Sequence, residues 1–217
     1  MKSAILLLCA ITFLTSCQSV QYVKGIKQVK TINGKYVNRN ITVNNPLKCV
    51  GQNKVSNTDT PADIMMGVQD CLESSDFKKG AFLYLYALNN AKYDTFRVSD
   101  KTSHTIIDGL AEMVFSDVNQ TELNSFKLYI QETLSNNTSF CSTLIKEGRP
   151  SYHPLYMVMS GNKYNRKNLI NNGLVQGYDP DKNWQDTLVY SGCKNELNDI
   201  KSEINSTITN HFKIIDI

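Results

Sequence analysis

The sequence lacks most of the short motifs that mark common catalytic sites, and its two SxxK matches, at residues 75–78 and 160–163, are interpreted as chance because the further motifs of the SxxK families are missing. A GxSxG nucleophile elbow, an HExxH zinc motif, a P-loop and a glycine-rich dinucleotide fingerprint are all missing. The six cysteines show no CxxC or CxxH spacing, which argues against a zinc site. We therefore expect no metal, no cofactor and no catalytic residue in this protein.

Long hydrophobic runs are also missing. The longest apolar stretch covers residues 4–14, whereas a helix that crosses a bilayer needs about 20 apolar residues. Lys2 precedes this stretch, and the small polar residues Thr15 and Ser16 follow it. A positive charge, a short apolar run and small residues in this order are typical of a secretory signal.

The end of this segment, Leu14-Thr15-Ser16-Cys17, resembles the lipobox of bacterial lipoproteins. The resemblance implies that residues 1–16 are a signal peptide that is removed, and that acylated Cys17 holds the protein on a lipid bilayer. Gln18 at the next position resembles an outer-membrane sorting signal, so we expect a location in the cell envelope, at the outer membrane and facing the periplasm. The alternatives are an ordinary signal peptide with an incidental cysteine and a buried N-terminal helix.

Acidic residues are missing from the segment that follows this signal. Residues 18–58 contain no Asp or Glu and seven Lys or Arg, although the net charge of the whole chain is only +3. Basic residues near a lipid anchor each add about 1 kcal/mol of attraction to an anionic surface. Residues 17–58 are therefore interpreted as a lipidated basic arm or linker, and a merely solvated arm is the alternative. The residues expected to contact an anionic envelope surface are Lys24, Lys27, Lys30 and Lys35.

Nucleic acid is not an expected partner of this basic segment, because no nucleic-acid-binding motif accompanies the charge and an exported location argues against it. The partners that we expect are a lipid bilayer, an anionic envelope surface and a protein that the sequence does not identify.

Four cysteines remain in the mature chain once Cys17 is acylated: Cys49, Cys71, Cys141 and Cys193. An even number of cysteines in an exported chain indicates two disulfide bonds. Three pairings are open, and we expect the sequential one, in which each cysteine is bonded to its neighbour along the chain. Bridges that close loops of these lengths each contribute on the order of 3 to 4 kcal/mol to stability.

Helical periodicity dominates residues 59–217 and predicts a compact bundle of short helices. One helix is expected over residues 76–90, with Ser75 as its cap, and a further short helical turn is expected over residues 91–98. Three other patterns are typical of helix starts. They are Thr60-Pro61, Asn119 with Glu122, and Asp179-Pro180.

A small β-hairpin is expected over residues 25–43, ahead of the helical domain. Asn33-Gly34 lies between two β-prone runs, and this dipeptide is a strong signal for a two-residue hairpin turn. A partly ordered arm is the alternative. The expected fold is therefore mainly α: a bundle of short helices stapled by disulfides, after a small basic hairpin or arm.

Residues 76–94, DFKKGAFLYLYALNNAKYD, resemble the first helix of tetratricopeptide or Sel1-like repeats. A repeat protein should show a second copy at a period of about 34 to 38 residues, and no such copy is found. We therefore expect a non-repeating helical bundle that uses similar packing chemistry.

Aromatic residues are concentrated in two segments of the helical domain, near residues 82–96 and 152–164. Tyrosine suits partner surfaces as well as half-buried core positions, since it joins a large apolar body to a polar tip. Core packing is expected for most of these residues, and those left exposed are the candidates for partner contact. The five partner-binding candidates are Tyr86, Tyr93, Tyr152, His153 and Tyr156.

These observations lead to the hypothesis of a membrane-anchored bacterial lipoprotein that binds another protein without catalysis, as a scaffold or assembly module of the envelope. The first alternative is an immunity-type lipoprotein that neutralises a toxin delivered into the periplasm. The second alternative is a hydrolase that acts on envelope polymers. The immunity alternative is suggested only by the expected envelope location of a small, tethered domain without motifs, and not by particular residues.

Overall fold

The computed structural model describes residues 29–30, 36–37, 41–162, 164 and 170–194. These residues are mainly helical, as predicted, and three short 3-10 helices connect the longer elements. The 3-10 helices are η1 (Gln52–Lys54), η2 (Lys101–Ser103) and η3 (Ile170–Gly173). The α-helices are α1 (Pro61–Glu73), α2 (Phe77–Arg97), α3 (Ile106–Phe115), α4 (Gln120–Ser135), α5 (Thr138–Glu147), α6 (Leu155–Val158) and α7 (Pro180–Tyr190).

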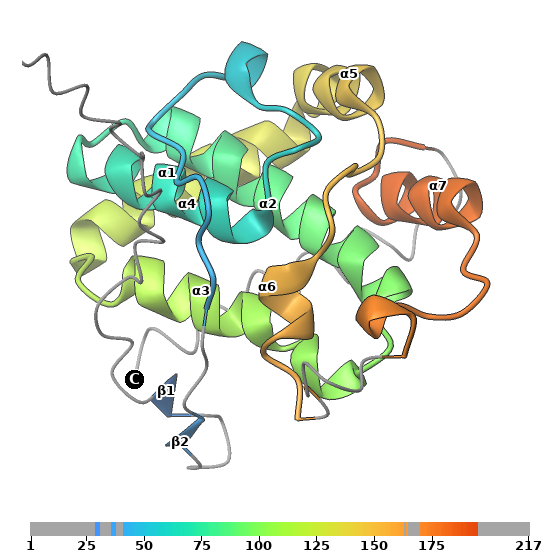
Figure 1. Cartoon of the computed structure of the whole chain (residues 1–217). Helices are drawn as coiled ribbons and strands as arrows, with labels where there is room; N and C mark the ends of the chain where they lie inside the picture. The colour runs from blue at the N-terminus through green and yellow to red at the C-terminus, as the bar shows by residue number, and fades with distance from the viewer. Residues whose placement is uncertain (1–28, 31–35, 38–40, 163, 165–169, 195–217) are drawn as a thin grey trace, which may run out of the picture.

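Helix α2 is the centre of the fold, and helices α1, α4 and α7 pack against it (Figure 1). It is 21 residues long, and every residue from Gly80 to Ala91 is buried. A helix that is apolar on all sides must be covered on all sides, which accounts for its central position. The sequence predicted a break after residue 90, but α2 continues to Arg97, and this prediction is wrong.

An aromatic cluster joins three helices at one end of the core. The ring of Tyr84 on α2 lies edge-on to Phe115 of α3 and Phe126 of α4, with ring centroids 5.4 and 5.8 Å apart. The rings of Phe115 and Phe126 are themselves 5.3 Å apart. Pairs of this geometry add about 0.5–1.5 kcal/mol each beyond the area that they bury.

The predicted helix starts at Thr60, Asn119 and Asp179 are confirmed, because each side chain accepts a hydrogen bond from a backbone N–H of the first turn. The predicted cap at Ser75 is wrong. Asp76 caps α2 instead by accepting a hydrogen bond from the N–H of Lys79, whereas Ser75 has a positive φ of 57° in the turn before the helix.

Residues 41–58 pack on the helical domain, although the sequence placed them in the arm or linker. Val43 and Val55 are only 5% and 4% exposed, and both belong to the hydrophobic core. The buried carboxylate of Asp63 accepts hydrogen bonds of 2.8 Å from the backbone N–H groups of Asn44 and Asn45. The domain therefore begins before residue 59, and the predicted boundary is corrected.

Two disulfide bonds join the cysteine pairs that the sequence favoured. Cys49, in the segment before α1, is bonded to Cys71 of α1, with Cα atoms 4.7 Å apart. Cys141 of α5 is bonded to Cys193, which follows α7, with Cα atoms 5.2 Å apart. The first bridge fastens the N-terminal segment to the core, and the second joins α5 to the end of α7.

The described part of the expected hairpin is one short antiparallel strand pair. Strand β1 (Val29–Lys30) pairs with β2 (Tyr36–Val37), with Val29 opposite Val37. Residues 25–28, 31–35 and 38–40 lie outside the described residues, and they include the expected turn at Asn33-Gly34. The hairpin therefore stays a prediction. Across the described residues, no helix is both long and apolar enough to cross a membrane.

Candidate binding groove

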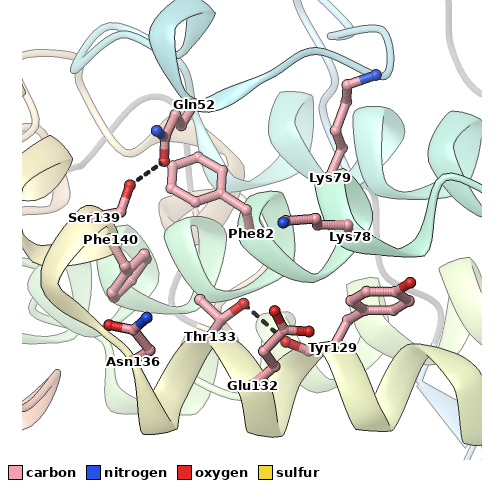
Figure 2. Close-up of a pocket in the computed structure, with 10 residues that line it drawn as sticks. All are labelled: Gln52, Lys78, Lys79, Phe82, Tyr129, Glu132, Thr133, Asn136, Ser139 and Phe140. Atoms are coloured by element: carbon pink, nitrogen blue, oxygen red, sulfur yellow. Dashed lines mark hydrogen bonds between the residues drawn. The ribbon is translucent and has the colours of Figure 1, made fainter.

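An open groove lies between α2, α4 and α5, and η1 closes one end of it (Figure 2). Its volume is about 470 Å³, within the range of typical ligand pockets. Aromatic rings, two lysines, one carboxylate and several amide or hydroxyl groups line it. These residues are Gln52, Lys78, Lys79, Phe82, Tyr129, Glu132, Thr133, Asn136, Ser139 and Phe140.

The floor of the groove is aromatic and fixed by packing. Phe82 is 8% exposed and Phe140 is 3% exposed, and their rings meet edge-to-face with centroids 5.9 Å apart. On its other side, Phe82 is stacked on Tyr86 with centroids 6.0 Å apart. The hydroxyl of Ser139 donates a 2.7 Å hydrogen bond to the side-chain oxygen of Gln52, which ties η1 to α5. The groove is therefore preformed at this end.

Charged side chains lie at the opposite end of the groove. Lys79 forms a 2.5 Å ion pair with Asp76, and this interaction lowers the pKa of the Asp76 carboxyl. The ammonium of Lys78 has no ion-pair partner among the described residues, and its side chain extends into the space between α2 and α4 (Figure 2). On the α4 wall, the carboxylate of Glu132 is also without an ion-pair partner in the described part of the chain.

A small slot of about 20 Å³ lies on the other side of Phe140. Asn89 of α2 and Ser191 after α7 line this slot together with apolar side chains. The Asn89 side-chain oxygen accepts a 2.7 Å hydrogen bond from the Ser191 hydroxyl, but the Asn89 amide nitrogen is buried and has no hydrogen-bond partner among the described residues.

The groove offers hydrogen-bonding and charged groups that can hold a ligand. Lysine donates hydrogen bonds, glutamate accepts them, and the Asn136 amide and the Tyr129 hydroxyl do both. Across the described ranges, no group of three or more His, Cys, Asp or Glu side chains could hold a metal ion. The arrangement can hold a ligand that combines an apolar group with hydrogen-bonding and charged groups.

Three of the five predicted partner-binding residues are core residues. Tyr86, Tyr93 and Tyr156 are each only 1% exposed, so their side chains cannot contact a partner. The prediction is therefore wrong for these three residues. Tyr152 is partly exposed and His153 is exposed, and both keep accessible surface. The surrounding protein and the nearby Arg97 guanidinium lower the pKa of His153.

The hydroxyl groups of Tyr152 and Tyr156 serve a buried ion pair. They donate hydrogen bonds of 2.9 and 2.8 Å to the same carboxylate oxygen of Asp94. Arg97 donates a 2.8 Å hydrogen bond from Nε to the other carboxylate oxygen, and its Nη1 donates to the backbone oxygen of Tyr152. The guanidinium also lies 5.0 Å from the ring centres of Tyr93 and Tyr152. These contacts join the end of α2 to α6 and to the segment before it.

The predicted lipid and surface contacts are not described by the structure. Cys17 and the lysines at positions 24, 27 and 35 lie outside the described residues, and of Lys30 only the backbone is described. Comparisons with known protein families, with curated proteins and with solved structures find no match to this chain. The resemblance to the lipobox and the faint resemblance to tetratricopeptide repeats therefore stay predictions from the residues themselves.

Proposed function

We propose that this protein is a lipid-anchored component of the bacterial cell envelope that binds a protein partner, without catalysis, through the groove between α2, α4 and α5. The observation that carries this proposal is the groove itself, where a rigid aromatic floor lies beside Lys78 and Glu132, neither of which has an ion-pair partner among the described residues. Protein interfaces commonly combine buried aromatic anchors with a polar rim.

The envelope location rests on the sequence alone. Leu14-Thr15-Ser16-Cys17 resembles a lipobox, and residues 18–58 form an acid-free segment directly after it. Several acyl chains hold a protein stably because each buried methylene adds about 0.8 kcal/mol of membrane affinity. The groove would thus face a partner that is either resident in, or delivered to, the same compartment.

Site-directed photocrosslinking tests the groove as the contact surface. Tyr129 lies in the groove, whereas Lys101 is exposed on η2 and does not line it. With photoreactive p-benzoylphenylalanine in place of Tyr129, we expect illumination of cells to produce one adduct larger than the protein. With the same group in place of Lys101, we expect no such adduct. Absence of the Tyr129 adduct, or the same adduct from both positions, would contradict a groove-specific protein partner.

Mass spectrometry of the Tyr129 adduct also separates the two non-catalytic roles. An envelope-assembly protein in the adduct supports the scaffold role, whereas a secreted toxin supports the immunity role. The identity of the cross-linked protein therefore decides between the scaffold role and the immunity role.

Metabolic labelling with palmitate tests the anchor. The wild-type chain is expected to carry label and to partition with membranes, and a Cys17→Ser chain is expected to lose the label and to leave the membrane fraction. Cys9→Ser is the matched control, because Leu8 before it does not fit the lipobox pattern. A labelled Cys17→Ser protein would show that the acylation site lies elsewhere.

A further inference from the structure

We infer that the groove binds an extended peptide segment of its partner, in which one acidic residue lies next to a bulky apolar residue. This inference rests on the proposed function and adds the chemistry of the partner. Three features of the groove support it: the limited exposure of the aromatic floor, the charges that are and are not paired within the described residues, and the polar groups that make no hydrogen bond there.

The aromatic floor favours an apolar side chain over a sugar ring. Phe82 and Phe140 line the groove but are only 8% and 3% exposed, so little of either ring face is open to a ligand. A sugar that stacks on an aromatic residue needs an open ring face. A branched or aromatic side chain can instead fill the space between the walls, where it gains contact with Phe82, the Lys78 stem and the Thr133 methyl group.

The charges of the groove favour a single carboxylate. Lys79 is already neutralised by Asp76, at 2.5 Å, and Asp76 is fixed as the cap of α2. Lys78 has no ion pair with any described residue, so a carboxylate of the partner would be its first counter-ion. Glu132 on the facing wall repels further acidic groups, and a run of acidic residues is therefore disfavoured.

The remaining polar groups suit a peptide backbone. The side-chain amide of Asn136 follows the last turn of α4 and makes no hydrogen bond within the described residues. Such an amide can donate to a carbonyl and accept from an N–H of the same extended chain. Glu132 can accept a second N–H. A single peptide can therefore provide partners for the donors, the acceptors and the charges of the groove.

Selection from a phage-displayed library of random dodecapeptides tests this inference. The bait is the full acylated protein in detergent micelles, as the wild type, as Lys78→Glu and as Lys101→Glu. We expect the wild type and Lys101→Glu to enrich peptides with Asp or Glu beside a large apolar residue. Lys78→Glu is expected to lose these peptides, to bind a synthetic copy about tenfold more weakly, and to select Lys or Arg at the acidic position.

A matched pair of tryptophan variants locates the binding site. Ser139 lines the groove and Ser142 does not, although both are exposed residues of α5. Ser139→Trp should fill the groove and abolish binding of the synthetic peptide, and Ser142→Trp should leave its affinity unchanged. Fluorescence anisotropy of a labelled peptide measures both affinities.

The outcomes separate this inference from the proposed function. If the selected peptides are lost with Ser139→Trp but show no acidic preference, the inference is wrong and the groove remains a protein-binding site. If they bind Ser139→Trp as they bind the wild type, the groove is not their site and the proposed function fails with the inference. If no peptide is enriched, or a peptidoglycan disaccharide binds the groove instead, a linear peptide is excluded, and the crosslink at Tyr129 alone decides the proposed function.

Discussion

Replacing Asp94 with alanine is expected to lower the free energy of unfolding by about 3–5 kcal/mol. The carboxylate is completely buried and Arg97 is 4% exposed, so Asp94→Ala leaves a guanidinium without its counter-ion in the core. The hydroxyls of Tyr152 and Tyr156 lose their common acceptor at the same time. Burial raises the pKa of Asp94, while Arg97 and the two tyrosines act in the opposite direction.

Urea unfolding followed by the fluorescence of Trp184 measures this effect. Trp184 is the single tryptophan of the chain, is 8% exposed, and packs edge-on against Tyr93 with ring centroids 5.9 Å apart. The control is Asp186→Ala, which breaks an exposed pair with Lys182 and should leave the unfolding midpoint almost unchanged.

A double variant separates the cost of leaving a buried charge without its counter-ion from the cost of losing the contacts of the ion pair. Asp94→Leu combined with Arg97→Met removes both charges, so its loss of stability should be smaller than that of Asp94→Ala. Equal midpoints for Asp94→Ala and Asp186→Ala would show that the buried pair does not hold the end of α2 to the segment before α6.

Loss of the second disulfide is expected to cost about 4 kcal/mol of stability. Cys141 and Cys193 are 52 residues apart, so their bond removes a large loop from the unfolded chain, and a paired Cys141→Ser/Cys193→Ser variant restores that freedom. Phe140, directly before Cys141, forms part of the groove floor. The same variant should therefore also weaken binding in the groove.

The first disulfide provides the comparison. Cys49 and Cys71 are 22 residues apart, and the same loop model gives a loss of about 3 kcal/mol for Cys49→Ser/Cys71→Ser. Because neither cysteine lines the groove, this variant should lose stability and keep its binding affinity at temperatures where it is folded. Binding that weakens equally in both variants would contradict a specific role of the second bridge at the floor. An unchanged unfolding midpoint in both paired variants would contradict the estimate that each disulfide stabilises the protein by closing a loop in the unfolded chain.

The helices could be predicted because their signals are local. Thr60 and Asn119 each cap a helix with a side-chain oxygen, and such a cap depends on residues only two or three positions away. The sequential disulfides were also predicted correctly. The end of α2 was not, because tertiary contacts hold it. Arg97 donates to the backbone oxygen of Tyr152, and the hydroxyls of Tyr152 and Tyr156 donate to Asp94 of the same helix end, so residues far along the chain take part.

The candidate site was missed for the same reason. Its lining residues extend from Gln52 to Phe140 and come from η1, α2, α4 and α5, so no local motif marks them. The partner-binding prediction relied on tyrosine content, which cannot distinguish a buried Tyr86 from an exposed residue of the same type. Lys78-Lys79 at the start of α2 was the one available hint, but only the structure shows that Asp76 pairs with Lys79.

The two disulfides also make the stability of this chain depend on the redox state of its surroundings. In a reducing compartment neither bridge persists, and the combined loss of about 7 kcal/mol is comparable to the whole stability of a typical domain. Under the proposed export, a precursor still in the cytosol would therefore remain loosely folded and competent for translocation. Oxidation in the proposed envelope location would then close both loops, and the groove would take its shape only there.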